Sequence, residues 1–219
     1  MNAATPARPG DTLTVVSGGA GLKALLQRAA GLDPNAIVRV RQFDDVTVEA
    51  FVTTPFEVVA ARRLRATLSR DGAAASAAAL ADALGSGDAT IDLGTPRDAS
   101  WPGALPPTGG FTLLDNLPVT VVRELADQGR ALARQFSGPA GPPASLMNQS
   151  VVTVTDAAGS ATVDIPMRMV FACVNLGLIP GFDAPMDIPR HLRVSALGRW
   201  VRVDAPFGSV YHSTRLSLF

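Results

Sequence analysis

The chain is poor in the side chains from which proteins build disulfides and metal sites. It has one cysteine, Cys173, and two histidines among 219 residues. No disulfide can form within the chain, and neither a zinc site of several cysteines nor a site of three histidines can be built. We therefore predict no metal and no bound cofactor.

The sequence also lacks net charge and long apolar runs. Basic and acidic side chains number 19 each, so composition gives no bulk attraction to nucleic acid or to a membrane surface. The first residues, MNAATPARPGDT, lack the apolar core of a signal peptide. The most apolar stretch, residues 167–182, is interrupted by Arg168, Asn175 and Pro180, and it is too short to span a bilayer. We expect a soluble cytoplasmic protein without a membrane partner.

What is present predicts an α+β fold. Runs of β-branched and alternating residues indicate strands, and apolar residues at helical spacing indicate helices. The expected strands are 12–16, 37–43, 47–54, 56–67, 90–93, 151–155, 161–165, 192–196, 199–205 and 208–218. The expected helices are 22–31, 73–84, 118–136 and 166–178, with Pro118 at the first helical position of the third.

Proline and glycine gather between residues 85 and 117 and predict a long loop there. We therefore divide the chain into a disordered lead-in at 1–10, a first α+β half at 11–93, a linker at 94–117 and a second α+β half at 118–219. A further Gly/Pro-rich linker is expected at 137–143.

The two halves share an order of elements. Each has a short strand, a helix that ends in a Gly-Leu pair, and a three-stranded antiparallel meander. The matching pairs are Gly31-Leu32 with Gly177-Leu178, Pro55-Phe56 with Pro206-Phe207, and Arg63-Leu64 with Arg215-Leu216. This order is consistent with two similar β-rich halves related by a pseudo-two-fold internal repeat. The alternative is chance similarity between common helix–meander combinations.

A glycine-rich turn is the first candidate site. Gly19, Gly21 and Lys23 belong to a G-x-G-x-x-A sequence that follows a predicted strand and opens a helix. Such a turn can bring backbone amides close to a phosphate, and Asp44 or Asp45 lies where a ribose-binding acid would be. The strands that follow lack crossover helices, which favours a simple strand-to-helix turn.

A sheet face with arginine and aromatic side chains is the second candidate. Alternation places Trp200, Arg202 and Asp204 on one side of their strand, and Tyr211, Ser213 and Arg215 on one side of the next. Arg193 is expected to join them. The first half has a similar set of arginine and aromatic residues, namely Arg39, Arg41, Phe43, Arg63 and Arg65. Such a face can hold single-stranded nucleic acid. The rival interpretations are a solvated face or an interface to another protein.

Catalysis is the third hypothesis. His212, Asp204 and serines 195, 209 and 213 are the types found in a Ser/His/Asp triad, but G-x-S-x-G is absent. A histidine among apolar neighbours is more often a hydrogen-bonded core residue. The sequence does not assign a role to His191, and Asn175 on an apolar helix is expected to need a hydrogen-bond partner. Cys173 reads as an inert core thiol.

These observations favour a non-enzymatic binding or assembly protein. It would act through its sheet faces or by self-association, with another protein or a second copy as partner. The alternative is a nucleotide-binding protein or enzyme that uses Gly19 and Gly21. The third function is single-stranded nucleic-acid binding through the face that carries Trp200, Arg202 and Tyr211.

Overall fold

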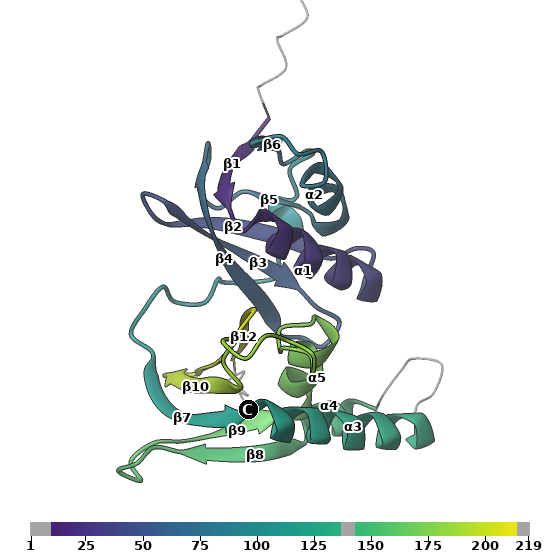
Figure 1. Ribbon diagram of the computed structural model, residues 1–219, viewed down its shortest axis with the longest axis vertical. Helices are drawn as coiled ribbons and strands as arrows, with labels where there is room; N and C mark the ends of the chain where they lie inside the picture. The colour runs from purple at the N-terminus through teal and green to yellow at the C-terminus, as the bar shows by residue number, and fades with distance from the viewer. Residues whose placement is uncertain (1–9, 137–142, 214–219) are drawn as a thin grey trace, which may run out of the picture.

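A computed structural model describes residues 10–136 and 143–213 of the chain. They form a mixed helix and strand fold in two halves that lie one above the other (Figure 1). The expectations for the lead-in, most of the 137–143 linker and the end of the last strand, with Arg215, lie outside the described residues.

The first half contains eight regular elements. They are β1 (Thr12–Ser17), α1 (Gly19–Leu32), β2 (Ile37–Asp44), β3 (Thr47–Thr53), β4 (Val59–Leu68), β5 (Ala74–Ser76), α2 (Ala77–Ala83) and β6 (Thr90–Asp92). A short 3-10 helix, η1 (Asp98–Ser100), follows in the connecting segment.

The second half is built from nine regular elements. They are β7 (Thr112–Pro118), α3 (Val119–Phe136), α4 (Ala144–Asn148), β8 (Ser150–Thr155), β9 (Thr162–Pro166), α5 (Met167–Asn175), β10 (His191–Leu197), β11 (Trp200–Ala205) and β12 (Gly208–Ser213). β8 and β9 form the expected hairpin as a separate two-stranded sheet.

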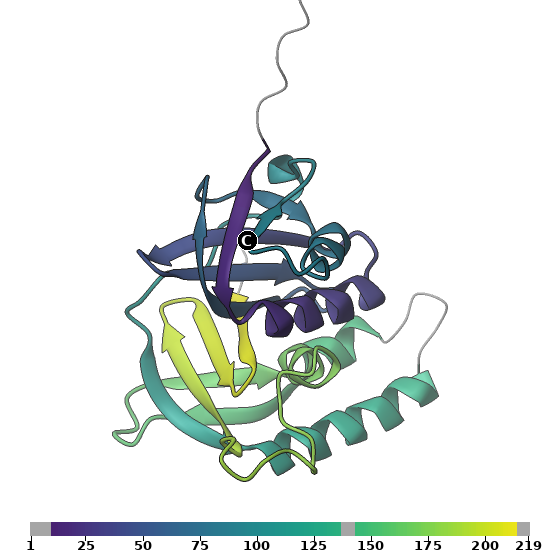
Figure 2. The same ribbon diagram turned by 45° about the horizontal axis from the view of Figure 1, so that its top comes forward.

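One sheet runs through both halves. Its main path has the order β5-β2-β3-β4-β12-β11-β10-β7; off this path, β1 pairs with β4 and β6 pairs with β1. The halves meet where β4 pairs antiparallel with β12, with Val59 opposite Tyr211 and Ala61 opposite Ser209. Figure 2 shows the two sets of strands adjoining at this seam. The seam makes the two halves one continuous surface.

The order of elements is consistent with an internal repeat. β1-α1-β2-β3-β4 in the first half has the same sequence of strand, helix and meander as β9-α5-β10-β11-β12 in the second. The two Pro-Phe pairs lie in corresponding connections, Pro55-Phe56 between β3 and β4 and Pro206-Phe207 between β11 and β12.

The main core lies between the sheet and the helices. Leu22, Leu25 and Leu26 of α1 are buried in the part of this core that lies in the first half. Helix α5 is apolar nearly all round, as its sequence predicts, and its first seven residues, which include Arg168, are buried. Among the described residues no helix is long and apolar enough to cross a membrane.

Three local predictions were wrong. The first residues of the expected helix 73–84 form β5, because pairing with β2 (Val38 opposite Ala75) overrides the helix propensity of alanine. The expected loop 85–117 contains β7 in addition to the short strand near residue 90. Pro118 ends β7 and does not start α3, which is tolerated because β7 is an edge strand of the main path.

Candidate functional site: the outer face of the sheet

Strand pairing places the predicted arginine and aromatic side chains on one face. Arg202 lies opposite Tyr211, and Asp204 lies opposite both Ser209 and Arg193. The intervening valines, such as Val203, are buried in the main core. We call the side of the main sheet path turned away from that core the outer face.

The seam extends the outer face into the first half. The register there places Arg63 of β4 opposite Glu49 of β3, and Glu49 opposite Arg41 of β2. Glu49 is 2% exposed. Arg41 Nη2 lies 2.6 Å from Glu49 Oε2, and Arg63 Nη2 lies 2.8 Å from Glu49 Oε1. Two arginines therefore share one buried carboxylate and fix each other's position.

The segment that connects the halves covers part of this face. Trp101 and Tyr211 belong to a small second core with Phe51 and Ala61, against which Phe111 packs. The Phe111 ring centroid lies 6.0 Å from that of Tyr211. Arg41 Nη1 donates a hydrogen bond of 2.6 Å to the Pro106 carbonyl.

This cover changes what Tyr211 and Arg202 can do. Tyr211 is buried, and that burial raises the pKa of its hydroxyl. The Arg202 guanidinium lies over the Phe111 ring, 4.5 Å from its centroid, and its Nε is 3.0 Å from Asp204 Oδ2. Stacking on a nucleic-acid base needs an open ring face, which Tyr211 does not offer.

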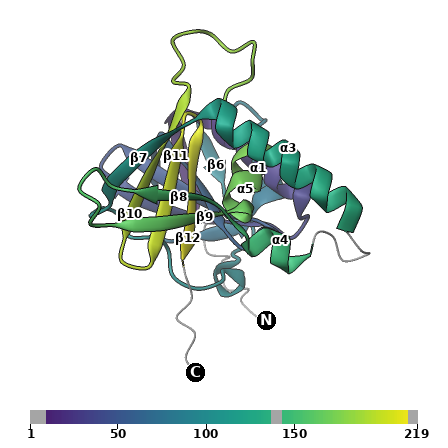
Figure 3. The same ribbon diagram turned by 90° about the horizontal axis from the view of Figure 1, so that it is seen from below.

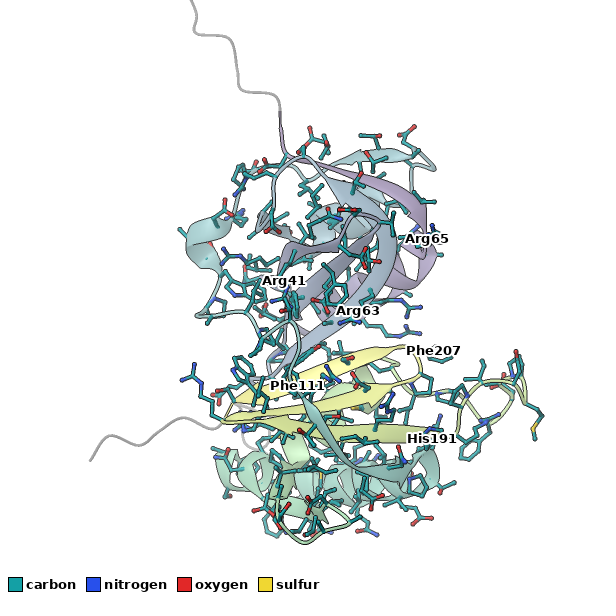
Figure 4. All side chains as sticks on the ribbon, turned by 90° about the vertical axis from the view of Figure 1, so that its left-hand side faces the viewer. Arg41, Arg63, Arg65, Phe111, His191 and Phe207 are labelled. Atoms are coloured by element: carbon teal, nitrogen blue, oxygen red, sulfur yellow. The ribbon has the colours of Figure 1, made fainter. Side chains whose placement is uncertain are left out.

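A groove of about 400 Å³ remains open at the seam. Its charged lining residues are Glu49, Arg62, Arg63, Arg193, Arg202 and Asp204. Four guanidinium groups against two carboxylates make the groove electropositive. Figure 4 shows Arg41, Arg63 and Arg65 on the strands above the seam and Phe111 and Phe207 near it. Arg65 and Arg193 are exposed and form no ion pair among the described residues.

The glycine-rich turn is packed from both sides. A Cβ on Gly21 would lie 2.3 Å from Arg62 Nη2, and one on Gly19 would lie 3.2 Å from Val15. The Lys23 side chain extends to Gly85, because a Cβ built on Gly85 would lie 2.7 Å from Lys23 Nζ. The space beside Gly21 thus holds a guanidinium group. Nucleotide binding at this turn stays a prediction that this geometry does not favour.

The candidate triad residues lie on two faces of the sheet. Asp204 accepts a hydrogen bond of 2.6 Å from Ser209 Oγ on the outer face. His212 pairs with Val201 and shares the inner side, where burial is the main cause that lowers its pKa. His191 is exposed at the start of β10, opposite Pro118.

Asn175 and Cys173 have surroundings that fit a structural role. Asn175 Oδ1 accepts a hydrogen bond of 3.3 Å from Arg130 Nη2, so its amide has the partner that the sequence led us to expect. Cys173 is buried, which raises the pKa of its thiol to about 12. In the two described ranges no group of three metal-ligating side chains comes together.

Sequence reasoning missed two parts of this face. Glu49 was not singled out, although it stands between Val48 and Ala50 in a strand that is buried continuously from Val48 to Val52. The aromatic residues Trp101 and Phe111 stand among the prolines and glycines of the connecting segment. Large aromatics in such a segment are the signal that it packs against something.

The fold resembles solved structures of sliding clamps. The DNA polymerase sliding clamp from Caulobacter crescentus matches with a TM-score of 0.57 at 10% identity, over 94% of this chain and 65% of the clamp. A putative DNA polymerase III beta subunit from Eubacterium rectale gives 0.56 at 9% identity, over 96% and 66%. The clamp from Pseudomonas aeruginosa gives 0.54 at 14%, over 96% and 66%. At these identities the match concerns the fold, and the chain spans about 65% of the clamps' length.

Family models divide the chain near the connecting segment. A search of curated proteins finds no match. The model of a domain of unknown function, DUF8010, matches residues 12–103, which contain the first half. A second model matches residues 106–217, more than half of the chain. The chain belongs to the family of that second model, the domain of unknown function DUF8185.

Proposed function

We propose that this chain is a non-enzymatic assembly protein that binds an acidic segment of another protein in the outer-face groove. The observation that carries the proposal is the fixed, electropositive groove at the seam. Its arginines belong to both halves, since Arg63 comes from β4 and Arg193 and Arg202 from β10 and β11. A partner that binds there would contact both halves at once.

Rigid positioning supports this role. Arg63 is held by Glu49 and lies 4.0 Å from the Phe43 ring centroid. Arg202 is held by Asp204 and Phe111. Preorganised guanidinium groups lose little conformational entropy when they bind a carboxylate, so affinity is higher than for free side chains.

Several features favour a protein over single-stranded nucleic acid. Tyr211 is buried, so its ring face cannot stack on a base. The chain as a whole carries no net positive charge, whereas nucleic-acid-binding domains are usually basic. A similar fold occurs in a putative DNA polymerase III beta subunit, and a subunit of a larger enzyme is an assembly component, which supports an assembly role.

The division into halves and their duplication form part of the proposal. We propose that the segment 94–117 joins two units of common origin. The connecting segment then serves two purposes, since it links the halves and covers the apolar part of the outer face.

The test is the binding of a fluorescently labelled glutamate 20-mer, followed by anisotropy in low salt. We expect binding by the wild type and a loss of about tenfold in affinity for R193E, because Arg193 lines the groove and a like charge replaces an attractive one. The matched control R97E makes the same change of net charge at an exposed arginine elsewhere, and it should bind nearly as the wild type. Equal losses in both variants, or tighter binding of a labelled dT 20-mer than of the peptide, would overturn the proposal.

A further inference from the structure

A loop between α5 and β10 presents two large apolar side chains to solvent. Phe182 is 84% exposed and Met186 is 92% exposed. Figure 3 shows the loop projecting from the body beside the start of α3. Exposed apolar side chains that stand together on a projection are typical of binding surfaces.

Hydrogen bonds hold this loop in one shape. Arg190 donates to the carbonyls of Gly181 and Ala184, at 2.8 and 2.7 Å. Arg123 of α3 donates to the Pro180 carbonyl and lies over the Phe182 ring, 4.7 Å from its centroid. Because the loop is already ordered, docking it costs little conformational entropy.

The loop's own side chains carry negative charge, while Arg123 and Arg190, which lie outside residues 181–187, contact its carbonyls and the Phe182 ring. Asp183 and Asp187 flank Met186 and Phe182, and residues 181–187 contain no basic side chain. The complementary site is therefore a cavity that offers both apolar side chains and cations. Charge complementarity of this kind selects a partner and sets its orientation.

The same molecule contains such a cavity. A pocket of about 360 Å³ lies between α1 and the segment that follows α5. Its lining residues are Gly21, Ala24, Leu25, Arg28, Arg62, Leu176, Gly177, Leu178, Ile179, Gly181 and Phe207. They include two arginines and no carboxylate. Neither Arg28 nor Arg62 forms an ion pair within the described residues.

We propose that the 181–187 loop of one chain enters this cavity of a second copy, which returns its own loop about a two-fold axis. Gly181 begins the loop and also borders the cavity, so donor and acceptor lie side by side on one surface. A patch that contains both halves of a contact is self-complementary and closes as a dimer. The loop does not fill the cavity of its own chain, because Phe182 lies on Arg123 and is exposed. The cavity and the outer-face groove share Arg62 and Phe207 in their linings, and the variants in the tests below change neither residue.

The first test is the mass of the full chain by light scattering and sedimentation from 1 to 100 µM. We expect a dimer for the wild type and a monomer for F182S/M186S, since the loop anchors are lost. The matched control V16S/V46S removes two exposed apolar side chains elsewhere and should remain a dimer. A wild type that is monomeric throughout, or a dimer that persists in F182S/M186S, would overturn the proposal.

The second test identifies the contact by charge exchange. R28E should weaken the dimer about tenfold, and D183R/D187R by more, since each places like charges together or removes attraction. In a mixture of the two variants, the acidic loop of the R28E chain meets the unchanged cavity of the D183R/D187R chain. The basic loop of the D183R/D187R chain meets the R28E cavity, whose positive charge is lower. The mixed dimer should therefore form more tightly than either variant with itself. A mixture that associates no better than its components shows that Arg28 does not face the loop and overturns the assignment.

Discussion

The guanidinium of Arg62 donates a hydrogen bond of 2.6 Å to the backbone carbonyl of Phe207, 145 positions further along the chain. Arg168 does the reverse from the second half, with a bond of 3.0 Å to the carbonyl of Phe56. Each Pro-Phe connection is thus tied to an arginine of the other half. These two contacts reinforce the seam between β4 and β12. The Arg62 contact also explains why residue 21 is a glycine, because a Cβ there would collide with the Arg62 guanidinium.

Gly21→Ala tests this packing. A methyl group there would displace Arg62, and losing its charged hydrogen bond costs about 1.5–3 kcal/mol, partly offset by about 1 kcal/mol of helix propensity. We expect a net loss of about 1 kcal/mol in the free energy of unfolding, measured by urea denaturation. In an R62A background the same change should instead stabilise by about 1 kcal/mol. Stabilisation of the same size in both backgrounds would contradict the role of Arg62.

Glu49→Gln tests the buried ion-pair cluster of the outer face. The change leaves Arg41 and Arg63 close together without their carboxylate. Removing one member of a buried pair costs about 3–5 kcal/mol, and the partial exposure of Arg63 places the expected loss at about 3 kcal/mol. The control D127N breaks an exposed pair on α3 and should cost under about 0.5 kcal/mol. Comparable losses for the two variants would show that the cluster is not a buried unit.

His212 predicts a pH dependence of stability. Burial lowers its pKa below the ordinary value of 6.5, with Arg168 adding to the effect and Glu57 opposing it. The unfolded chain then binds a proton more readily than the folded one, so stability falls as the pH drops below about 6.5. We expect a smaller free energy of unfolding at pH 5.5 than at pH 7.5, and H212Q should flatten this difference. A slope that is unchanged in H212Q would assign the dependence to other groups.

Cys173 predicts a thiol that reacts only after unfolding. Its burial raises its pKa to about 12, so almost no thiolate exists at pH 8 and reagents have no access. A disulfide-forming reagent should label the native protein only at the rate of unfolding and label it at once in denaturant. Rapid labelling of the native protein would show that α5 is not sealed in the core.

Much of the fold could be predicted because its signals are local. Alternation marked most strands, and it separated Trp200, Arg202 and Asp204 from Val201 and Val203, since the side chains of a strand alternate between its two faces. The sequence also predicts the buried helix around Cys173 and the shared order of elements in the two halves. The misplaced elements, β5 and Pro118, are positions where sheet pairing decided against local propensity.

The candidate site depended on contacts that local patterns do not contain. Sequence determined which residues share a strand face, because that follows from a two-residue period. Only the tertiary structure decided that β4 adjoins β12, that Trp101 and Phe111 cover Tyr211, and that Glu49 lies between Arg41 and Arg63. The physical reason is that strand order and loop placement are selected by the burial of the whole chain, which brings together residues far apart in sequence.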